Sequence, residues 1–126
     1  MILADTDVLI DFLRGKGDTA DRVALEIERG QLRTTVISRF ELLSGAASPR
    51  DEERVRTLLA AIPALPLDDD AADRGALVRK DLDSEGRSIG MGDSLIAGIA
   101  LARGLVLLTR NVRHFARVKG LVLGRA

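Results

Sequence analysis

Short apolar runs alternate along this chain with longer stretches in which apolar residues recur at helical spacing. Short apolar or β-branched runs are typical of buried strands, and the longer periodic stretches are typical of helices. Strands that alternate with helices usually pair in parallel, with helices on both faces of the sheet. We therefore expect an α/β protein with three layers, α/β/α, around a central, mostly parallel sheet of four to five strands. The predicted strands cover residues 2–4, 34–37, 65–67, 105–108 and 121–123.

Capping residues and glycines set the bounds of the expected helices. Ser, Thr or Asp favours a helix start, Pro favours the first helical position, and Gly favours the end. A helix over residues 7–13 is followed by one that Asp18 or Thr19 caps and that ends before Gly30. The other predicted helices cover residues 38–43, 49–62, 70–82 and 93–103, with a helical turn over 111–118.

Composition excludes several classes of protein. The chain has 126 residues, 46% of them hydrophobic, which predicts one domain over residues 1–126 that needs no disulfide or metal to fold. It has no cysteine, so thiolate metal sites and thiol enzymes are excluded, and His114 is its one histidine. No apolar stretch approaches the ~20 residues of a membrane span. The first residues do not resemble a signal peptide, so we expect a cytoplasmic protein that does not enter a membrane.

Acidic residues follow the predicted strands. In a parallel sheet, ligands bind beyond the carboxyl ends of the strands. Asp5 follows the first strand, Glu41 lies shortly after the second, and Asp93 starts the helix that leads into the fourth. Gathered carboxylates repel one another, and a divalent cation offsets that repulsion. Oxygen ligands without His or Cys favour Mg²⁺ or Mn²⁺, and the chemistry that follows is hydrolysis of a phosphate ester. The polar residues beside these acids are Thr6, Ser38, Thr109 and Asn111.

Basic residues gather at the end of the chain. The formal charges cancel, with 19 basic and 19 acidic residues. No acid follows Asp93, whereas six bases do, among them Arg110, Arg113 and Arg125. Arg is the better bidentate partner for phosphate. Arg110 and Arg113 both follow the fourth strand, so we expect them to face the acidic edge and to bind phosphate there.

Each acid also has a purely structural interpretation. Asp5 is a good helix cap, and Asp93 could simply complement a helix dipole. Glu41 stands three residues after Ser38, the spacing of a capping box, so its structural and functional interpretations are equally supported. Other acidic residues on helices are expected to be solvated, and His114 is expected to pack or to lie at the surface. The acids expected to be solvated helix-face charges are Asp7 and Asp11.

Four segments resemble the motifs of PIN-domain nucleases. They are LADTDVLI at 3–10, ISRFELLSG at 37–45, GDSLIA at 92–97 and LLTRNVRHF at 107–115. The segments occur in the family's order and span nearly the whole chain. The length of the chain and the Thr-Arg-Asn segment are most similar to the VapC toxins of bacterial toxin–antitoxin systems.

The resemblance implies an endoribonuclease that uses Mg²⁺ or Mn²⁺. It assigns Asp5, Glu41 and Asp93 to the catalytic metal site and gives supporting roles to Thr6, Ser38, Thr109 and Asn111. Family members often have a fourth acid in the last segment, where this chain has Asn111 and His114. Whether the site binds one metal ion or two therefore stays open. The resemblance also implies an RNA substrate, a homodimer and a cognate VapB-type antitoxin.

Three other functions fit parts of the sequence. In a haloacid-dehalogenase-like phosphatase, Asp5 would be the nucleophile, Asp7 the general acid and Lys80 the later lysine. That interpretation leaves Glu41 without a role and normally needs a longer chain. A receiver-like signalling domain would need a phosphoacceptor such as Asp68, which Pro66 disfavours. A catalytically inactive domain that only binds RNA or a partner would be expected to have lost an acid.

Overall fold

Five parallel strands form one sheet in the computed structural model, which describes residues 1–124. The order across the sheet is β3-β2-β1-β4-β5, and every neighbouring pair is parallel. This confirms the predicted parallel sheet. Arg125 of the basic C-terminal group lies outside the described residues. The strands are β1 (Ile2–Ala4), β2 (Leu32–Thr35), β3 (Ala64–Leu65), β4 (Val106–Leu108) and β5 (Leu123–Gly124).

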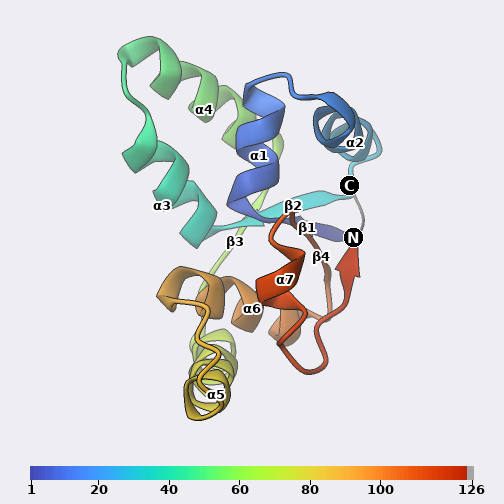
Figure 1. The fold of residues 1–126 in the computed structure, drawn as a ribbon. Coiled ribbons are helices and arrows are strands. Elements are labelled where there is room, and N and C mark those ends of the chain that lie inside the picture. Colours follow the sequence, from blue (N-terminus) through green and yellow to red (C-terminus); the bar gives the residue numbers. More distant parts are fainter. Residues whose placement is uncertain (125–126) are drawn as a thin grey trace.

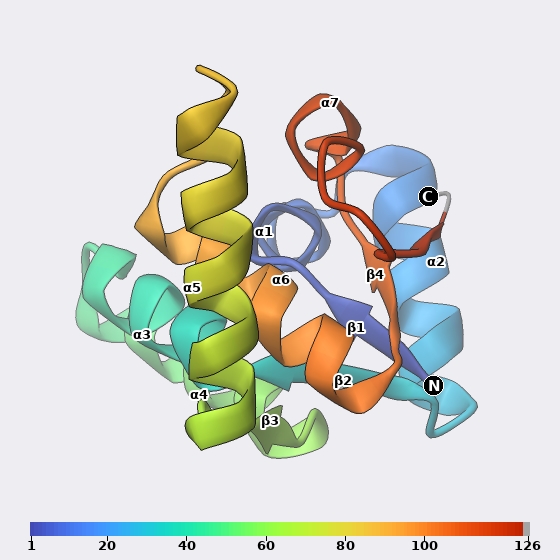
Figure 2. The same cartoon turned by 90° about the horizontal axis from the view of Figure 1, so that it is seen from below.

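Helices cover both faces of the sheet, as the α/β/α prediction requires (Figure 1). Four lie on one face and three on the other, and the view from below places α5 and α6 in front of the strands (Figure 2). None of the described helices has the length and apolar character needed to span a bilayer. The first face carries α1 (Thr6–Leu13), α2 (Gly17–Glu28), α3 (Val36–Gly45) and α4 (Pro49–Ala61); the second carries α5 (Asp69–Ser84), α6 (Met91–Arg103) and α7 (Val112–Phe115).

The two central strands divide their side chains between two cores. The register of β1 and β4 pairs Leu3 with Leu107 and Ala4 with Leu108. Successive strand residues point to opposite faces. Leu3 and Leu107 therefore pack with α5, α6 and α7, whereas Ala4 and Leu108 pack with α1 to α4. All four side chains are fully buried, which explains why both strands are apolar throughout.

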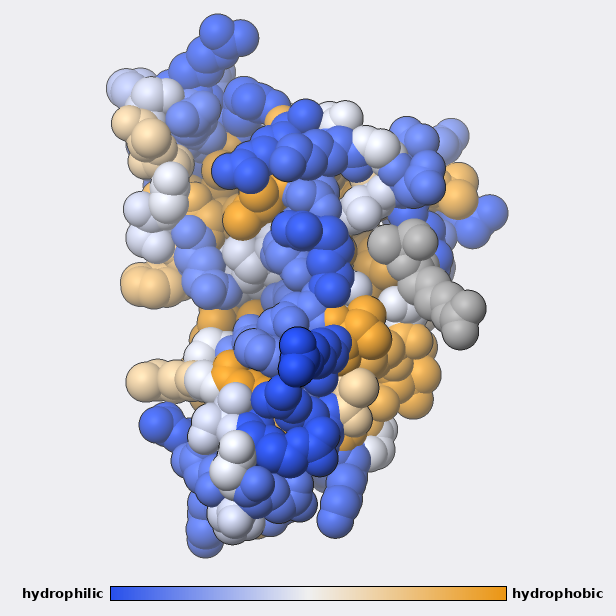
Figure 3. Space-filling model, viewed as in Figure 1, coloured by the Kyte–Doolittle hydropathy of each residue, from blue (hydrophilic) through white to orange (hydrophobic). Residues whose placement is uncertain are grey.

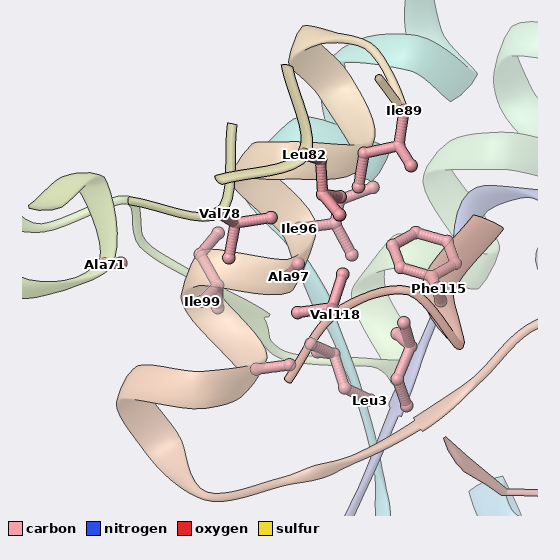
Figure 4. Packing of buried hydrophobic residues seen from close by; sticks show 12 residues of the cluster. Leu3, Ala71, Val78, Leu82, Ile89, Ile96, Ala97, Ile99, Phe115 and Val118 are labelled. Carbon is pink, nitrogen blue, oxygen red and sulfur yellow. The ribbon is translucent and has the colours of Figure 1, made fainter. Parts of the chain in front are cut away.

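The core below the sheet depends on a close approach of α5 and α6. Figure 4 shows Val78, Ile96 and Ile99 lying together between these helices, near Leu3 of β1. A Cβ added to Gly98 of α6 would lie 2.3 Å from the carbonyl oxygen of Ala71 on α5. The two helix backbones therefore pack directly on each other at this point, which a larger residue would prevent.

Two element boundaries that matter for the site differ from the prediction. The run 34–37 was expected to be a strand, but β2 ends at Thr35 and α3 begins at Val36. The reason is that the Thr35 side chain caps α3 by accepting a hydrogen bond from the Ser38 N–H, at 3.0 Å. Similarly, α6 begins at Met91 and not at Asp93, because Gly90 takes the N-cap position with a φ of 91°.

The predicted cap of the second helix is wrong, because α2 begins at Gly17 after Lys16 and neither Asp18 nor Thr19 caps it. The remaining differences are small. β3 starts at Ala64, one residue before the predicted strand 65–67, and ends at Leu65. β5 begins at Leu123, the last residue of the predicted strand 121–123. The helical turn after β4 is limited to α7, because Asn111 is its N-cap and Ala116 its C-cap.

Candidate active site

The predicted acids come together at the carboxyl edge of the sheet. Asp5 follows β1 directly, Glu41 lies on α3 just after β2, and Asp93 lies in the first turn of α6. The neighbouring charges of Asp7 and Asp93 both raise the pKa of Asp5, and the charge of Glu41 raises that of Asp93. These acids are thus close enough to repel one another.

Asp5 is the most buried of these acids, at 5% exposure. Its Oδ1 accepts a hydrogen bond from the Thr6 N–H at 2.8 Å, and its Oδ2 accepts one from the Thr109 hydroxyl at 2.7 Å. Burial, followed by the charge of Asp7, raises the pKa of Asp5 to about 7, although both hydrogen bonds lower it. Asp5 is the N-cap of α1, so its structural interpretation is also correct.

Thr6 connects the first two acids. Its backbone N–H binds Asp5, and its hydroxyl donates to Glu41 Oε1 at 2.7 Å. The same hydroxyl lies 2.9 Å from Ser38 Oγ, which is fully buried beside Thr35. Glu41 therefore does not reach back to the Ser38 N–H, whose partner is Thr35. The capping-box interpretation is wrong, because Thr35 and not Ser38 caps α3.

Asp93 faces the loop after β4. The Asn111 side-chain amide donates to Asp93 Oδ2 at 3.4 Å and lies 3.0 Å from His114 Nδ1. His114 Nδ1 itself is 3.7 Å from Asp93 Oδ2. Burial raises the pKa of Asp93, whereas its contact with His114 lowers it. His114, which the sequence placed outside the site, is therefore the neighbour of Asp93.

Asp7 is a member of the site that the sequence analysis missed. It was expected to be solvated, but Asp7 Oδ2 accepts a hydrogen bond from the Arg110 N–H at 3.1 Å and lies 3.4 Å from the Thr109 hydroxyl. Its Oδ1 is buried and has no hydrogen-bond partner among residues 1–124, and burial raises the pKa of Asp7. The signal available in the sequence was its position two residues after Asp5, at the end of a strand.

Asp11 is also not a solvated charge. It lies one turn after Asp7 on α1, is 5% exposed, and pairs with Arg110 through Nε and Oδ2, which are 2.7 Å apart. The Arg110 side chain is 54% exposed. Arg113 is exposed on α7. Figure 3 shows a band of hydrophilic residues down the middle of the face seen in Figure 1, between apolar patches.

The donor set fits a hard divalent cation. Within residues 1–124, no three His, Asp or Glu side chains converge closely enough to form a complete metal cage. Mg²⁺ does not require one, because it keeps several waters and uses one or two carboxylates. The acids of the site offer carboxylate oxygens, and Asp7 Oδ1 is a buried acceptor that a cation or its water would satisfy. The mutual repulsion of the acids also favours added positive charge.

Residues that other functions would need have different roles. Asp68, the phosphoacceptor candidate of a receiver-like domain, caps α5 and pairs with Arg103 at 3.3 Å. Lys80, which the phosphatase interpretation requires, is exposed on α5, and no described hydrogen bond or ion pair joins it to the acids. Both alternatives therefore lose a residue on which they depend.

Comparison with known proteins decides the family. A family model described as the PIN domain matches residues 2–121. The chain belongs to the PIN-domain family. Ribonuclease VapC10 of Mycobacterium tuberculosis is 40% identical over 116 residues, which cover 91% of this chain and 86% of that protein. The protein named tRNA(fMet)-specific endonuclease VapC of Shigella flexneri is 31% identical over 123 residues, 94% of this chain and 92% of that one.

Solved structures of PIN-domain complexes share the fold. VapBC from Salmonella typhimurium, solved bound to DNA, is 28% identical, with a TM-score of 0.83 over 98% of this chain and 96% of that one. VapBC2 of Rickettsia felis, bound to a promoter DNA fragment, has a TM-score of 0.88 at 22% identity, over 100% and 99% of the two chains. The α/β/α architecture of this chain is thus the architecture of the VapC-type PIN domain.

Proposed function

We propose that this protein is an endoribonuclease that depends on Mg²⁺ or Mn²⁺, and that it is the VapC-type toxin of a toxin–antitoxin pair. The observation that carries the proposal is a set of mutually repelling carboxylates at the carboxyl edge of the sheet, in a chain of the PIN-domain family. The two relatives compared above, both named as nucleases, cover 94% and 91% of the chain.

In this proposal Asp5, Glu41 and Asp93 bind the metal ion, one or two of them directly and the rest through its water ligands, and Asp7 Oδ1 is a nearby unused acceptor. A bound divalent cation polarises a phosphoryl oxygen and lowers the pKa of an attacking water. The hydrogen bonds from Thr6 and Thr109 fix both oxygens of Asp5 and lower its pKa, so they favour the ionised form that binds a cation.

The supporting residues orient the other two acids. Ser38 is buried against the Thr6 hydroxyl, which in turn holds Glu41 Oε1. Asn111 holds Asp93 Oδ2 from the loop after β4. Side chains that are fixed by hydrogen bonds present their oxygens with little reorganisation, which is how outer partners of a metal site contribute to affinity.

RNA is the proposed substrate, with phosphate bound by Arg110 and Arg113. The backbone N–H of Arg110 donates to Asp7, and its guanidinium pairs with Asp11, so Arg110 lies beside α1 at the acidic edge. Such an arginine can pair with the phosphodiester whose scissile phosphate lies over the carboxylates. Transfer RNA is the first substrate class to test, because relatives from two organisms are named as tRNA(fMet)-specific endonucleases.

The partners follow from the relatives. Several solved neighbours are described as VapBC complexes, so we propose a VapB-type antitoxin that covers the acidic edge, and a cytoplasmic location where RNA and antitoxin are made. We also propose a homodimer, since closed two-fold dimers are the commonest oligomers. Light scattering after gel filtration tests the dimer, because the monomer has a mass of 13.6 kDa.

Incubation of the partner-free protein with total small RNA tests the activity. The reaction is run with Mg²⁺, with Mn²⁺ and with a chelator, and the new RNA ends are sequenced. Discrete fragments that require metal support the proposal. No fragments from folded protein, together with turnover of a small phosphate ester that disappears in Asp7→Ala, would instead favour the phosphatase.

A further inference from the structure

Two carboxylates on α1 hold Arg110 from one side. Asp7 Oδ2 accepts a hydrogen bond from the Arg110 backbone N–H at 3.1 Å, and Asp11 Oδ2 lies 2.7 Å from its side-chain Nε. Asp7 and Asp11 are four residues apart on the same helix, so they lie on one face, one turn apart. The backbone and the side chain of Arg110 are thus fixed separately, by different acids.

Asp11 has no role in the metal site as proposed, yet it is buried. Its side chain is 7% exposed, whereas that of Arg110 is 54% exposed. A buried carboxylate loses its hydration, so it persists only where a close partner compensates. Arg110 is the one ion-pair partner of Asp11 within residues 1–124. The contact therefore holds a half-exposed guanidinium against a fixed, buried carboxylate.

The pairing uses only part of the guanidinium. Arg has five N–H donors, and Nε is the guanidinium nitrogen nearest to Asp11. No hydrogen bond from the Arg110 guanidinium is present among residues 1–124. The Nη donors therefore stay available to a ligand, while the ion pair with Asp11 holds the Nε end of the group. Such a fork matches the two free oxygens of a phosphodiester.

We propose that Asp11 is a positioning residue that orients the Arg110 guanidinium for an RNA phosphodiester, an inference that rests on the proposed function. An unpaired arginine loses rotamer freedom when it binds phosphate, and this loss weakens binding. Because Asp11 already restricts the Arg110 side chain before RNA binds, part of that loss of entropy no longer accompanies binding. The negative charge of Asp11 acts in the opposite direction, because it partly neutralises Arg110. We infer that orientation outweighs neutralisation, since Asp11 leaves the Nη donors free.

The test compares Asp11→Asn with a matched control. Glu26 on α2 is a second buried acid, 4% exposed, whose Oε1 lies 3.2 Å from Arg29 Nη1 and 3.7 Å from Arg22 Nε, away from the acidic edge. Glu26→Gln therefore removes the same kind of pair without changing the site. Binding is measured by fluorescence anisotropy with a labelled single-stranded RNA of mixed sequence, in an Asp93→Asn background with Mg²⁺, so that no cleavage occurs.

Asp11→Asn is expected to raise the dissociation constant for this RNA by about threefold to tenfold, the cost of ordering one long side chain. Glu26→Gln is expected to leave it unchanged. In an Arg110→Ala background, Asp11→Asn should have no further effect, because its action passes through Arg110. With Asp93 restored, Asp11→Asn should raise KM for RNA cleavage and leave kcat within about twofold, since no hydrogen bond or ion pair among residues 1–124 joins the Arg110 side chain to Asp5, Glu41 or Asp93.

Equal or tighter RNA binding by Asp11→Asn would overturn the inference and would show that Asp11 competes with RNA for Arg110. Additive losses in the Arg110→Ala background would also overturn it, because Asp11 would then act elsewhere. Failure of the parent protein to bind RNA at all is a different result, which overturns the proposed function and this inference with it.

Discussion

The Thr109 hydroxyl donates a 2.7 Å hydrogen bond to Asp5 Oδ2 and so connects the end of β4 to the end of β1. The Asn111 N–H donates in turn to Thr109 Oγ1 at 2.9 Å, which fixes the direction of the hydroxyl proton. Asp5 is thereby held in one orientation although burial raises its pKa to about 7. Burial thus disfavours the ionised form of Asp5, whereas the hydrogen bond from Thr109 favours that form.

Thr109→Val is expected to weaken the site without unfolding the protein. The variant has the same shape but loses the hydrogen bond to Asp5, so the pKa of Asp5 rises further and cation binding becomes weaker. Loss of such an outer partner typically costs about 10–100-fold in metal affinity. Titration calorimetry with Mn²⁺ measures the change. Thr109→Ser keeps the hydroxyl and serves as the control; unaltered Mn²⁺ affinity in Thr109→Val would show that this contact is dispensable.

The stability of the metal-free protein is expected to fall as the pH rises from about 4 to 7. The pKa of Asp5 is about 7 in the folded protein against 3.8 for the ordinary group, so the folded state binds the proton more tightly. The stabilising proton is lost as the pH passes through the folded pKa, at a cost of up to about 4 kcal/mol. The raised pKa values of Asp7 and Asp93 act in the same direction.

Thermal unfolding in chelator at several pH values measures this effect. Asp5→Asn should flatten the dependence and melt at a higher temperature than wild type at pH 8, because it removes a buried charge. Asp73→Asn, a change at an exposed position of α5, should leave the slope as in wild type. A steep slope that persists in Asp5→Asn would assign the titration to another group.

Gly98→Ala is expected to destabilise the protein by about 1–3 kcal/mol or more, the usual cost of overpacking. The added Cβ would meet backbone atoms of Ala71 and Gly75 at 2.3–2.9 Å, and a backbone cannot rotate away as a side chain can. Urea unfolding gives the free energy. Gly45→Ala on α3, where nothing lies within 4 Å, should be neutral or slightly stabilising. Equal stability of both variants would mean that α5 and α6 are farther apart.

Asp7→Asn is expected to slow RNA cleavage about tenfold but not to abolish it, a loss of the size seen when an outer partner of a metal site is removed. The amide oxygen still accepts from the Arg110 N–H, while the orphaned Oδ1 acceptor is replaced by a donor. Single-turnover cleavage rates measure the effect. A complete loss would instead make Asp7 indispensable to the chemistry, as in a phosphatase that uses it as general acid.

Much of this fold was predictable because its signals are local. The strands that contain Leu3 and Leu107 are apolar throughout because both faces of the sheet are buried. Pro49, preceded by Ser48, begins α4 at the predicted position. The β-branched run at 34–37 was wrongly predicted to be a strand throughout, because its strand propensity competes with the tendency of Thr35 to cap a helix. Thr35 is at once the last residue of β2 and the cap of α3. Which of these roles ends the strand depends on tertiary packing.

The site was less predictable for a different reason. The convergence of Asp5, Glu41 and Asp93 could be predicted because each lies near the end of a strand or the start of a helix at the same edge. Asp11 could not be placed there, and Asp7 was missed despite its position two residues after Asp5, because a carboxylate on a helix is expected to be solvated until its neighbour is known. Their partner is Arg110, about a hundred residues later in the chain, and only the β1–β4 pairing brings it to α1.

Cleavage of transfer RNA by wild type and by Asp93→Asn, side by side with Mg²⁺, tests the central claim most directly. Asp73→Asn is the matched control, and melting curves verify that all three proteins are folded. We predict discrete fragments from wild type and Asp73→Asn, and a loss of about a hundredfold or more in Asp93→Asn, since the metal contributes several kcal/mol to the transition state. Cleavage by folded Asp93→Asn at the wild-type rate would contradict an acidic metal site at this edge of the sheet.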